Sequence, residues 1–154
     1  MPKILTIGSE TFDFPVENEN GNYGESVTSW AEAVSQALGT VQQPNDIPVS
    51  TASILNNVTT ATAILGFSFD TSQVIAIEAQ YIVRRSTSSS NSVESGRIEG
   101  NYNGTSWSIT VESVGTAGIT FDISPSGQVT YTSTNVSGAS YTGSILFKAK
   151  VFNQ

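Results

Sequence analysis

The sequence predicts a mainly β protein: an antiparallel β-sandwich in the C-terminal part, preceded by an N-terminal arm and one short amphipathic helix. Three observations lead to this prediction. From about Phe67 onward, apolar and polar residues alternate with a period of two, as they do in half-buried strands. Turn signals containing Gly or Pro separate the alternating stretches. The chain is rich in Ser and Thr and only 12% charged, which favours extended β structure because Thr suits a pleated surface.

The alternation marks about six short strands. Ile75, Ile77, Ala79, Tyr81 and Val83 are predicted to share one face of the first long strand. A Ser-rich stretch at 86–92 follows it and is predicted to form a flexible hairpin loop. Short strands at regular spacing are typical of sandwiches and barrels. The other alternating stretches are 107–111, 119–123, 129–131 and 145–151, and the turn signals between strands are Asn103-Gly104, Pro125-Ser126-Gly127 and Ser137-Gly138.

The first 66 residues follow a different pattern. Residues 1–22 are predicted to form one strand or extended arm, because the apolar stretch at 4–7 precedes a polar segment with turn signals. A helix is predicted at about 25–38, where apolar residues recur at helical spacing and Gly39 suits the C-cap. Residues 40–65 have no clean period and are predicted to be an irregular connector or surface loop. We therefore expect an attachment and oligomerisation segment at 1–66 and a projecting β domain at 67–154.

Composition excludes several classes of function. The formal net charge of -7 and the pI of about 4.3 argue against a nucleic-acid partner, because phosphate binding needs Lys and Arg clusters and Arg84-Arg85 is too small a patch. Without Cys or His there is no disulfide, thiolate nucleophile, Cys/His metal site or imidazole base. We expect no catalytic residue, no cofactor, no metal and no membrane insertion. The N-terminus has too short an apolar run for a signal peptide, so assembly in the cytoplasm of the cell that makes the chain is expected.

Three weaker constellations stay as alternatives. Glu94 and Glu99 could in principle serve as a glycosidase pair, but no spacing indicates that they face each other across a cleft. The segment containing Asp13, Glu17 and Glu19 lacks a calcium-loop pattern and favours a solvated acidic loop. Four aromatic residues could form a sugar-binding platform, although we favour core or interface positions for them: Trp30, Tyr102, Trp107 and Tyr131.

A self-associating surface is the main predicted site. The predicted helix and the connector at 58–65 both carry apolar side chains, and one small sandwich cannot obviously cover the apolar surface of both. Large exposed apolar patches usually mark interfaces. We therefore expect a homo-oligomer, with a trimer as the expected assembly. The candidate oligomer and attachment residues are Ile4, Leu5, Phe12, Phe14, Trp30, Val34, Leu38, Ile64 and Leu65.

Several segments resemble a known kind of domain. Tyr-Ile-Val-Arg-Arg at 81–85 is followed by a polar loop and by Val-Glu-Ser-Gly-Arg-Ile at 93–98. Later segments are Trp-Ser-Ile at 107–109, Gly-Ile-Thr-Phe at 118–121 and Gly-Gln-Val-Thr-Tyr-Thr at 127–132, and an earlier one is Tyr-Gly-Glu-Ser-Val-Thr-Ser-Trp-Ala at 23–31. Together they resemble a β domain, with its preceding helix, that recurs in virion proteins of tailed bacteriophages described as head fibre, tail fibre or structural proteins.

The resemblance implies assembly in threes, attachment to a capsid or tail, and no catalysis. Combined with the composition, it leads us to expect a non-enzymatic virion protein: a homotrimeric capsid (head) fibre or decoration-type component anchored through its N-terminal segment. The alternative is a tail fibre, a tail adaptor or a carbohydrate-binding module for host recognition, with a host surface glycan as its ligand.

Overall fold

The computed structural model describes residues 3–7, 10–14, 34 and 45–154. The chain divides into two compact units, Met1–Gln42 and Gln43–Gln154. Apart from Val34, the predicted helix at 25–38 lies outside the described residues, as do Trp30 and Leu38. The strands are β1 Lys3–Ile7, β2 Glu10–Phe14, β3 Ile47–Ser53, β4 Thr62–Ser68, β5 Val74–Ser86, β6 Asn91–Tyr102, β7 Trp107–Gly115, β8 Ile119–Ile123, β9 Gln128–Ser133 and β10 Thr142–Asn153.

The first unit contains an antiparallel pair of strands, β1 and β2. Its register places Leu5 opposite Phe12, Lys3 opposite Phe14 and Ile4 opposite Asp13. The prediction of one strand in this region is therefore corrected to two. Phe12 and Phe14 flank Asp13, which is the period-two alternation of a strand, but the stretch is too short to stand out in the sequence.

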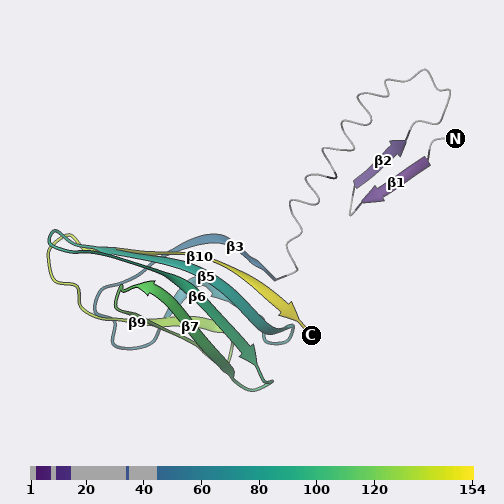
Figure 1. The fold of residues 1–154 in the computed structure, drawn as a ribbon. Coiled ribbons are helices and arrows are strands. Elements are labelled where there is room, and N and C mark those ends of the chain that lie inside the picture. Colours follow the sequence, from purple (N-terminus) through teal and green to yellow (C-terminus); the bar gives the residue numbers. More distant parts are fainter. Residues whose placement is uncertain (1–2, 8–9, 15–33, 35–44) are drawn as a thin grey trace. The chain divides into compact units, whose positions relative to one another are not determined.

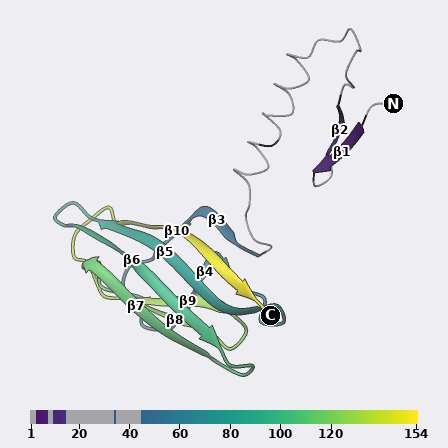
Figure 2. The same ribbon diagram turned by 45° about the vertical axis from the view of Figure 1, so that its right-hand side comes forward.

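The second unit consists of two antiparallel sheets. A five-stranded sheet has the order β3-β10-β5-β6-β7, and a three-stranded sheet has the order β4-β9-β8. Figures 1 and 2 show the long strands of the larger sheet in one layer, with β9 behind them in both views. The prediction of a mainly β chain with antiparallel sheets is confirmed.

Aromatic rings join the two sheets through one core. Phe67 of β4 stacks on Phe147 of β10 with ring centroids 4.2 Å apart, and Tyr81 of β5 meets Phe121 of β8 edge to face at 4.8 Å. Such ring pairs add roughly 0.5–1.5 kcal/mol each to the free energy of area burial. The alternation predicted at 119–123, 129–131 and 145–151 is confirmed, although Ile119 is only half-buried. The buried residues of these strands are Phe121, Ile123, Val129, Tyr131, Ile145, Phe147, Ala149 and Val151.

The predicted face of β5 is right except at its start. Ile77, Ala79, Tyr81 and Val83 are buried, but Ile75 is 41% exposed and Val74 is buried instead. The register with β10 shifts between Phe152, which pairs with Ala76, and Asn153, which pairs with Val74. One additional residue of β5 is accommodated there, and such a bulge reverses the faces beyond it.

The stretch at 40–65 contains strands that we did not predict. β3 and most of β4 fall within it, so it is not an irregular connector, and the boundary predicted between residues 66 and 67 differs from the unit boundary between 42 and 43. β4 buries Ile64 and Phe67, which are three residues apart, and its register with β9 breaks between Ala63 and Ser68. Gly66 has φ +76° at this break, a geometry typical of a bulge. Because the bulge adds a residue between Ile64 and Phe67, the sequence of β4 shows no period of two.

One of two predicted hairpin loops lies as predicted, and the other is held more firmly than predicted. The Asn103-Gly104 turn joins Tyr102 to Trp107 as predicted, and Gly104 has φ +90°. The connection is a loop of four residues, 103–106, in which Asn103 does not have a positive φ. The loop between β5 and β6, predicted to be flexible, is held to residues 137–139: Thr87 donates to the Ser137 carbonyl at 2.8 Å, and the Ser88 amide donates to the Ala139 carbonyl at 2.8 Å.

Candidate interaction surface

The outer face of the five-stranded sheet, turned away from the core, carries an apolar row across its strands. Leu146 of β10 lies opposite Ile82 of β5, and Ser95 of β6 connects Ile82 to Val114 of β7. Leu146 is 41% exposed, Ile82 36% and Val114 78%. We call these three residues the apolar row. Alternation places them outside because their neighbours Tyr81, Val83 and Phe147 occupy the core.

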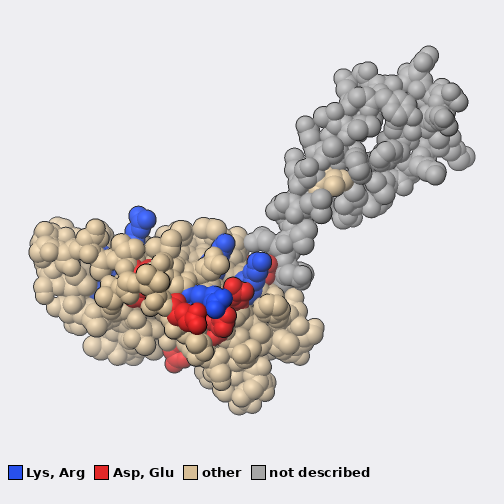
Figure 3. All heavy atoms as spheres, in the orientation of Figure 1, with Lys and Arg blue, Asp and Glu red and all other residues tan. Residues whose placement is uncertain are grey.

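A charged row lies next to the apolar row. Lys148, Gln80, Arg97 and Glu112 are successive cross-strand partners from β10 to β7. Arg97 Nη2 lies 3.2 Å from Glu112 Oε2 and 3.2 Å from Glu99 Oε1. Figure 3 shows acidic and basic side chains gathered side by side on this part of the surface. Exposed ion pairs of this kind contribute only about 0–1 kcal/mol each, so they set the charge pattern of the face more than its stability.

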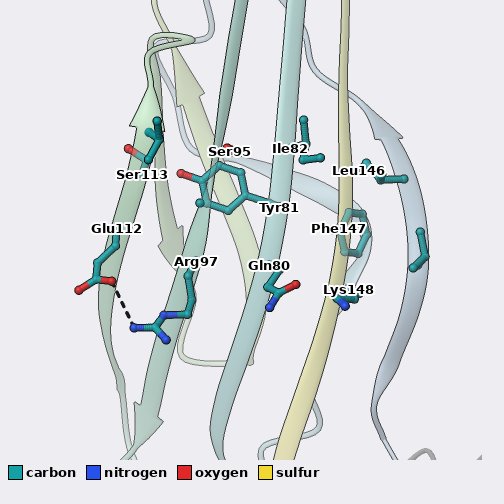
Figure 4. A pocket seen from close by; sticks show the side chains of 13 residues that line it. Gln80, Tyr81, Ile82, Ser95, Arg97, Glu112, Ser113, Leu146, Phe147 and Lys148 are labelled. Atoms are coloured by element: carbon teal, nitrogen blue, oxygen red, sulfur yellow. Dashed lines mark hydrogen bonds and ion pairs between the residues drawn. The ribbon is translucent and has the colours of Figure 1, made fainter.

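The two rows form a groove of about 610 Å³, lined also by Val49 of β3. Figure 4 shows Ile82 and Leu146 beside Gln80 and Lys148, with the Arg97–Glu112 ion pair on the side of β7. An aliphatic floor next to a charged row suits a protein surface, because apolar contact provides affinity while charge pairing fixes orientation. The groove is larger than two other hollows of the β unit, which have volumes of about 390 and 510 Å³.

A buried polar network lies at the opposite face of the same sheet. Arg85 of β5 is fully buried, and its five N–H groups all find acceptors. They donate to the Tyr141 hydroxyl (3.0 Å), to Asn56 Oδ1 (2.9 Å) and to the carbonyls of Ala117, Gly118 and Thr134. The guanidinium therefore fastens together three loops, those between β3 and β4, β7 and β8, and β9 and β10.

Glu94 of β6 extends this network. Its carboxylate accepts the Tyr81 hydroxyl at 2.8 Å and the Ala117 amide at 2.7 Å. Burial raises the pKa of Tyr81, and the hydrogen bond and negative charge of Glu94 raise it further, while a hydrogen bond with Ser113 lowers it. These contacts give Arg85 and Glu94 an architectural role. The sequence indicated that both side chains are buried, since each is in phase with the buried residues of its strand. It did not indicate their hydrogen-bond partners, because these lie in loops that are distant in sequence.

The candidate interface residues fall in different places. Ile4, Leu5, Phe12 and Phe14 lie in the β1–β2 pair, and Trp30 and Leu38 are outside the described residues. Val34 is half-buried. Ile64 is 1% exposed and packs in the core, so it has no surface to offer, whereas its neighbour Leu65 is 87% exposed at the bulge. The structure therefore does not bring Ile64 and Leu65 to one surface. The apolar row was not among the predicted residues, because finding it requires the register between strands.

The other sequence candidates also have definite positions. Tyr131 is buried and Trp107 is half-buried against the core, in agreement with the core alternative for these aromatic residues. Glu99 pairs with Arg97 on the outer face, while Glu94 points into the core, so these two carboxylates lie on opposite faces of β6. Among the described residues there is no group of three or more acidic side chains placed to hold a metal ion. The same residues contain no helix long and apolar enough to cross a membrane.

Comparisons with known proteins give one structural neighbour to report. No family model matches the chain, and no curated protein matches it. The fold is similar to part of the tailspike protein of Acinetobacter phage vB_ApiP_P1, with a TM-score of 0.40 and 10% sequence identity. The match covers 68% of this chain and 22% of the tailspike chain.

Proposed function

We propose that this protein is a non-enzymatic structural component of a bacteriophage particle, and that its β unit binds other proteins through the groove on the five-stranded sheet. The carrying observation is the apolar row of Leu146, Ile82 and Val114 beside a charged row. Exposed aliphatic side chains that gather on one sheet face, here with only Ser95 between Ile82 and Val114, are typical of surfaces that bind a partner. Its partners in this proposal are further copies of the chain and the capsid or tail proteins of the particle.

The placement of the acidic residues supports a non-catalytic role. Glu94 accepts two hydrogen bonds inside the protein, and Glu99 and Glu112 share Arg97. Asp70 accepts from the amide and hydroxyl of Ser72 in a turn, and these bonds lower the pKa of its carboxyl. Each of these carboxylates is engaged in holding the fold or its surface charge pattern, whereas a general acid needs an environment that keeps its proton available.

The groove favours a protein partner over a glycan. Its exposed apolar side chains are aliphatic, from Val, Ile and Leu, whereas Tyr131 and Trp107 are turned into the core. Sugar rings are bound most effectively by flat aromatic faces next to hydrogen-bonding groups. A head fibre or decoration protein is thus the leading proposal, with a tail fibre or tail adaptor as its alternative. Anchoring through residues 1–42 completes the proposal, because these residues form a compact unit of their own.

A single substitution on the groove tests the proposal. Ile82→Glu introduces a charge into the middle of the apolar row, where the side chain is 36% exposed and the fold can tolerate it. Thr120→Glu is the matched control, because Thr120 is an exposed strand residue of the other sheet. We expect phage carrying Ile82→Glu to assemble particles that contain little of this protein, while Thr120→Glu particles contain the normal amount. Equal incorporation of the two variants would exclude the groove as the binding surface.

A further inference from the structure

Among the described strands, β7 forms an open edge of the five-stranded sheet, and it is unlike the other three edges of the β unit. The opposite edge, β3, contains Pro48 and a register shift against β10. β4 is interrupted by the bulge at Gly66, and β8 is only five residues long. β7 pairs with β6 over nine residues without a register shift and contains no proline. Natural proteins usually blunt a long exposed edge, because its unpaired backbone groups bind other strands.

The backbone groups on this edge can be assigned from the hairpin that precedes β7. The Asn103 amide donates to the Ser106 carbonyl at 3.1 Å, so Ser106 directs its backbone groups toward β6. In an antiparallel ladder the direction alternates from residue to residue. Ser108, Thr110, Glu112 and Val114 therefore face β6, and their neighbours Trp107, Ile109, Val111 and Ser113 direct their N–H and C=O groups to the open side.

We propose that β7 pairs edge to edge with β7 of a second copy of this chain, antiparallel and with Val111 on the two-fold axis. The strand spans Trp107–Gly115, so a pairing centred on Val111 uses all nine residues of each copy. It places Trp107 opposite Gly115 of the second copy, which leaves space for the large ring beside a residue without a side chain. Ile109 then lies opposite Ser113 of the second copy, and the two five-stranded sheets become continuous.

The charge pattern of β7 agrees with this register. Glu112 is its sole charged residue, and the pairing places it opposite Thr110 of the second copy. A register centred on Glu112 would place two carboxylates directly opposite each other, which destabilises a strand pair. Within its own chain, Glu112 is already paired with Arg97, so the edge presents little net charge to the second copy.

This inference goes beyond the proposed function and is tested without phage particles. The full chain has no cysteine, so single cysteines report on the register directly. Paired residues across an antiparallel ladder have Cα atoms about 5.5 Å apart, within the range that a disulfide spans. Mild oxidation should cross-link Val111→Cys into a dimer. Val114→Cys is the control, because Val114 is more exposed, at 78% against 39%, yet lies opposite Ser108 of the second copy in this register.

A proline variant tests the same pairing without cross-linking. Val111→Pro removes an N–H group that points to the open side, which an edge strand tolerates, whereas Val111→Ala keeps that group. The proposed pairing makes a dimer, in place of the trimer expected from the sequence. By light scattering at micromolar concentration, the wild-type protein and Val111→Ala should have twice the mass of one 16.3 kDa chain, and Val111→Pro should have the mass of one chain. A monomeric wild-type protein, an association that Val111→Pro leaves intact, or equal cross-linking of Val114→Cys would overturn the proposal.

Discussion

Replacing Arg85 by Met is predicted to be among the most damaging single substitutions in the β unit. Met keeps most of the length and volume of the side chain but has no N–H donor. The substitution removes five hydrogen bonds and leaves the Ala117 carbonyl without its donor. The other carbonyl and amide oxygens keep a backbone amide: Asn56 Oδ1 that of Val136, the Gly118 carbonyl that of Thr134, and the Thr134 carbonyl that of Asn57. The change in the free energy of unfolding therefore reports the loss of the hydrogen bonds and not the formation of a cavity.

The expected loss follows from the number and burial of these acceptors. The buried Ala117 carbonyl, left without a donor, costs about 1–3 kcal/mol, and each of the other lost hydrogen bonds costs about 0.5–1.5 kcal/mol because its acceptor keeps another partner. Removing a buried cation returns part of its desolvation cost. We expect a net loss of about 3–5 kcal/mol in the free energy of unfolding, a large fraction of the roughly 5–15 kcal/mol available to a domain.

Urea denaturation followed by circular dichroism measures this loss, and the adjacent arginine provides the control. Arg84 points to the outer face of the same strand and is exposed, so Arg84→Met should change the free energy of unfolding by no more than about 0.5 kcal/mol. Arg85→Lys should lie between the two, because an ammonium group has three donors and no planar fork. A loss below about 1 kcal/mol for Arg85→Met would refute the reasoning that the network holds the loops together.

Further predictions concern the core, a turn, pH and the two units. Phe147→Ala removes the ring that stacks on Phe67 and should cost about 3–5 kcal/mol by urea denaturation. Gly104→Val should cost about 1 kcal/mol by the same assay, because Gly104 has φ +90° with no neighbouring atom to clash. The pKa of Tyr81 is raised above its ordinary 10.0, so the protonated Tyr81 hydroxyl stabilises the folded state fully below pH 10, and this contribution is lost as the pH rises further. Tyr81→Phe should therefore reduce the decline of the free energy of unfolding at alkaline pH. Residues 43–154 expressed alone should keep the β circular dichroism spectrum and cooperative unfolding of the full chain; a non-cooperative transition would contradict two independent units.

The regular strands were predictable because each has one face in the core. Ile145, Phe147, Ala149 and Val151 show the alternation of β10 in the sequence itself, and all four are buried. β3 gave no such signal, since it lies at an edge and buries only Ala52. In β4 a single bulge at Gly66 breaks the period, and in β5 another bulge exchanges Ile75 for Val74. A period of two cannot reveal an insertion of one residue.

The candidate site was less predictable, because it depends on which strands are neighbours. Leu146, Ile82 and Val114 come from three strands whose order in the sheet, β10-β5-β6-β7, does not follow the chain. Each residue alone resembles an ordinary exposed aliphatic side chain. Similarly, Arg85 belongs to a sequence pair that suggested a minor surface patch, and only the positions of the Ala117 and Thr134 carbonyls explain why it is buried.

Mass spectrometry of purified particles of the phage proposed to encode this chain tests the central claim most directly. Wild-type particles should contain the protein in a fixed ratio to the major capsid protein that persists through repeated density-gradient purification. Particles from a phage lacking codons 1–22, which include β1 and β2, should lack it, although the shortened protein remains soluble in the infected cell. A protein that is abundant in the lysate but absent from purified wild-type particles would contradict a structural role.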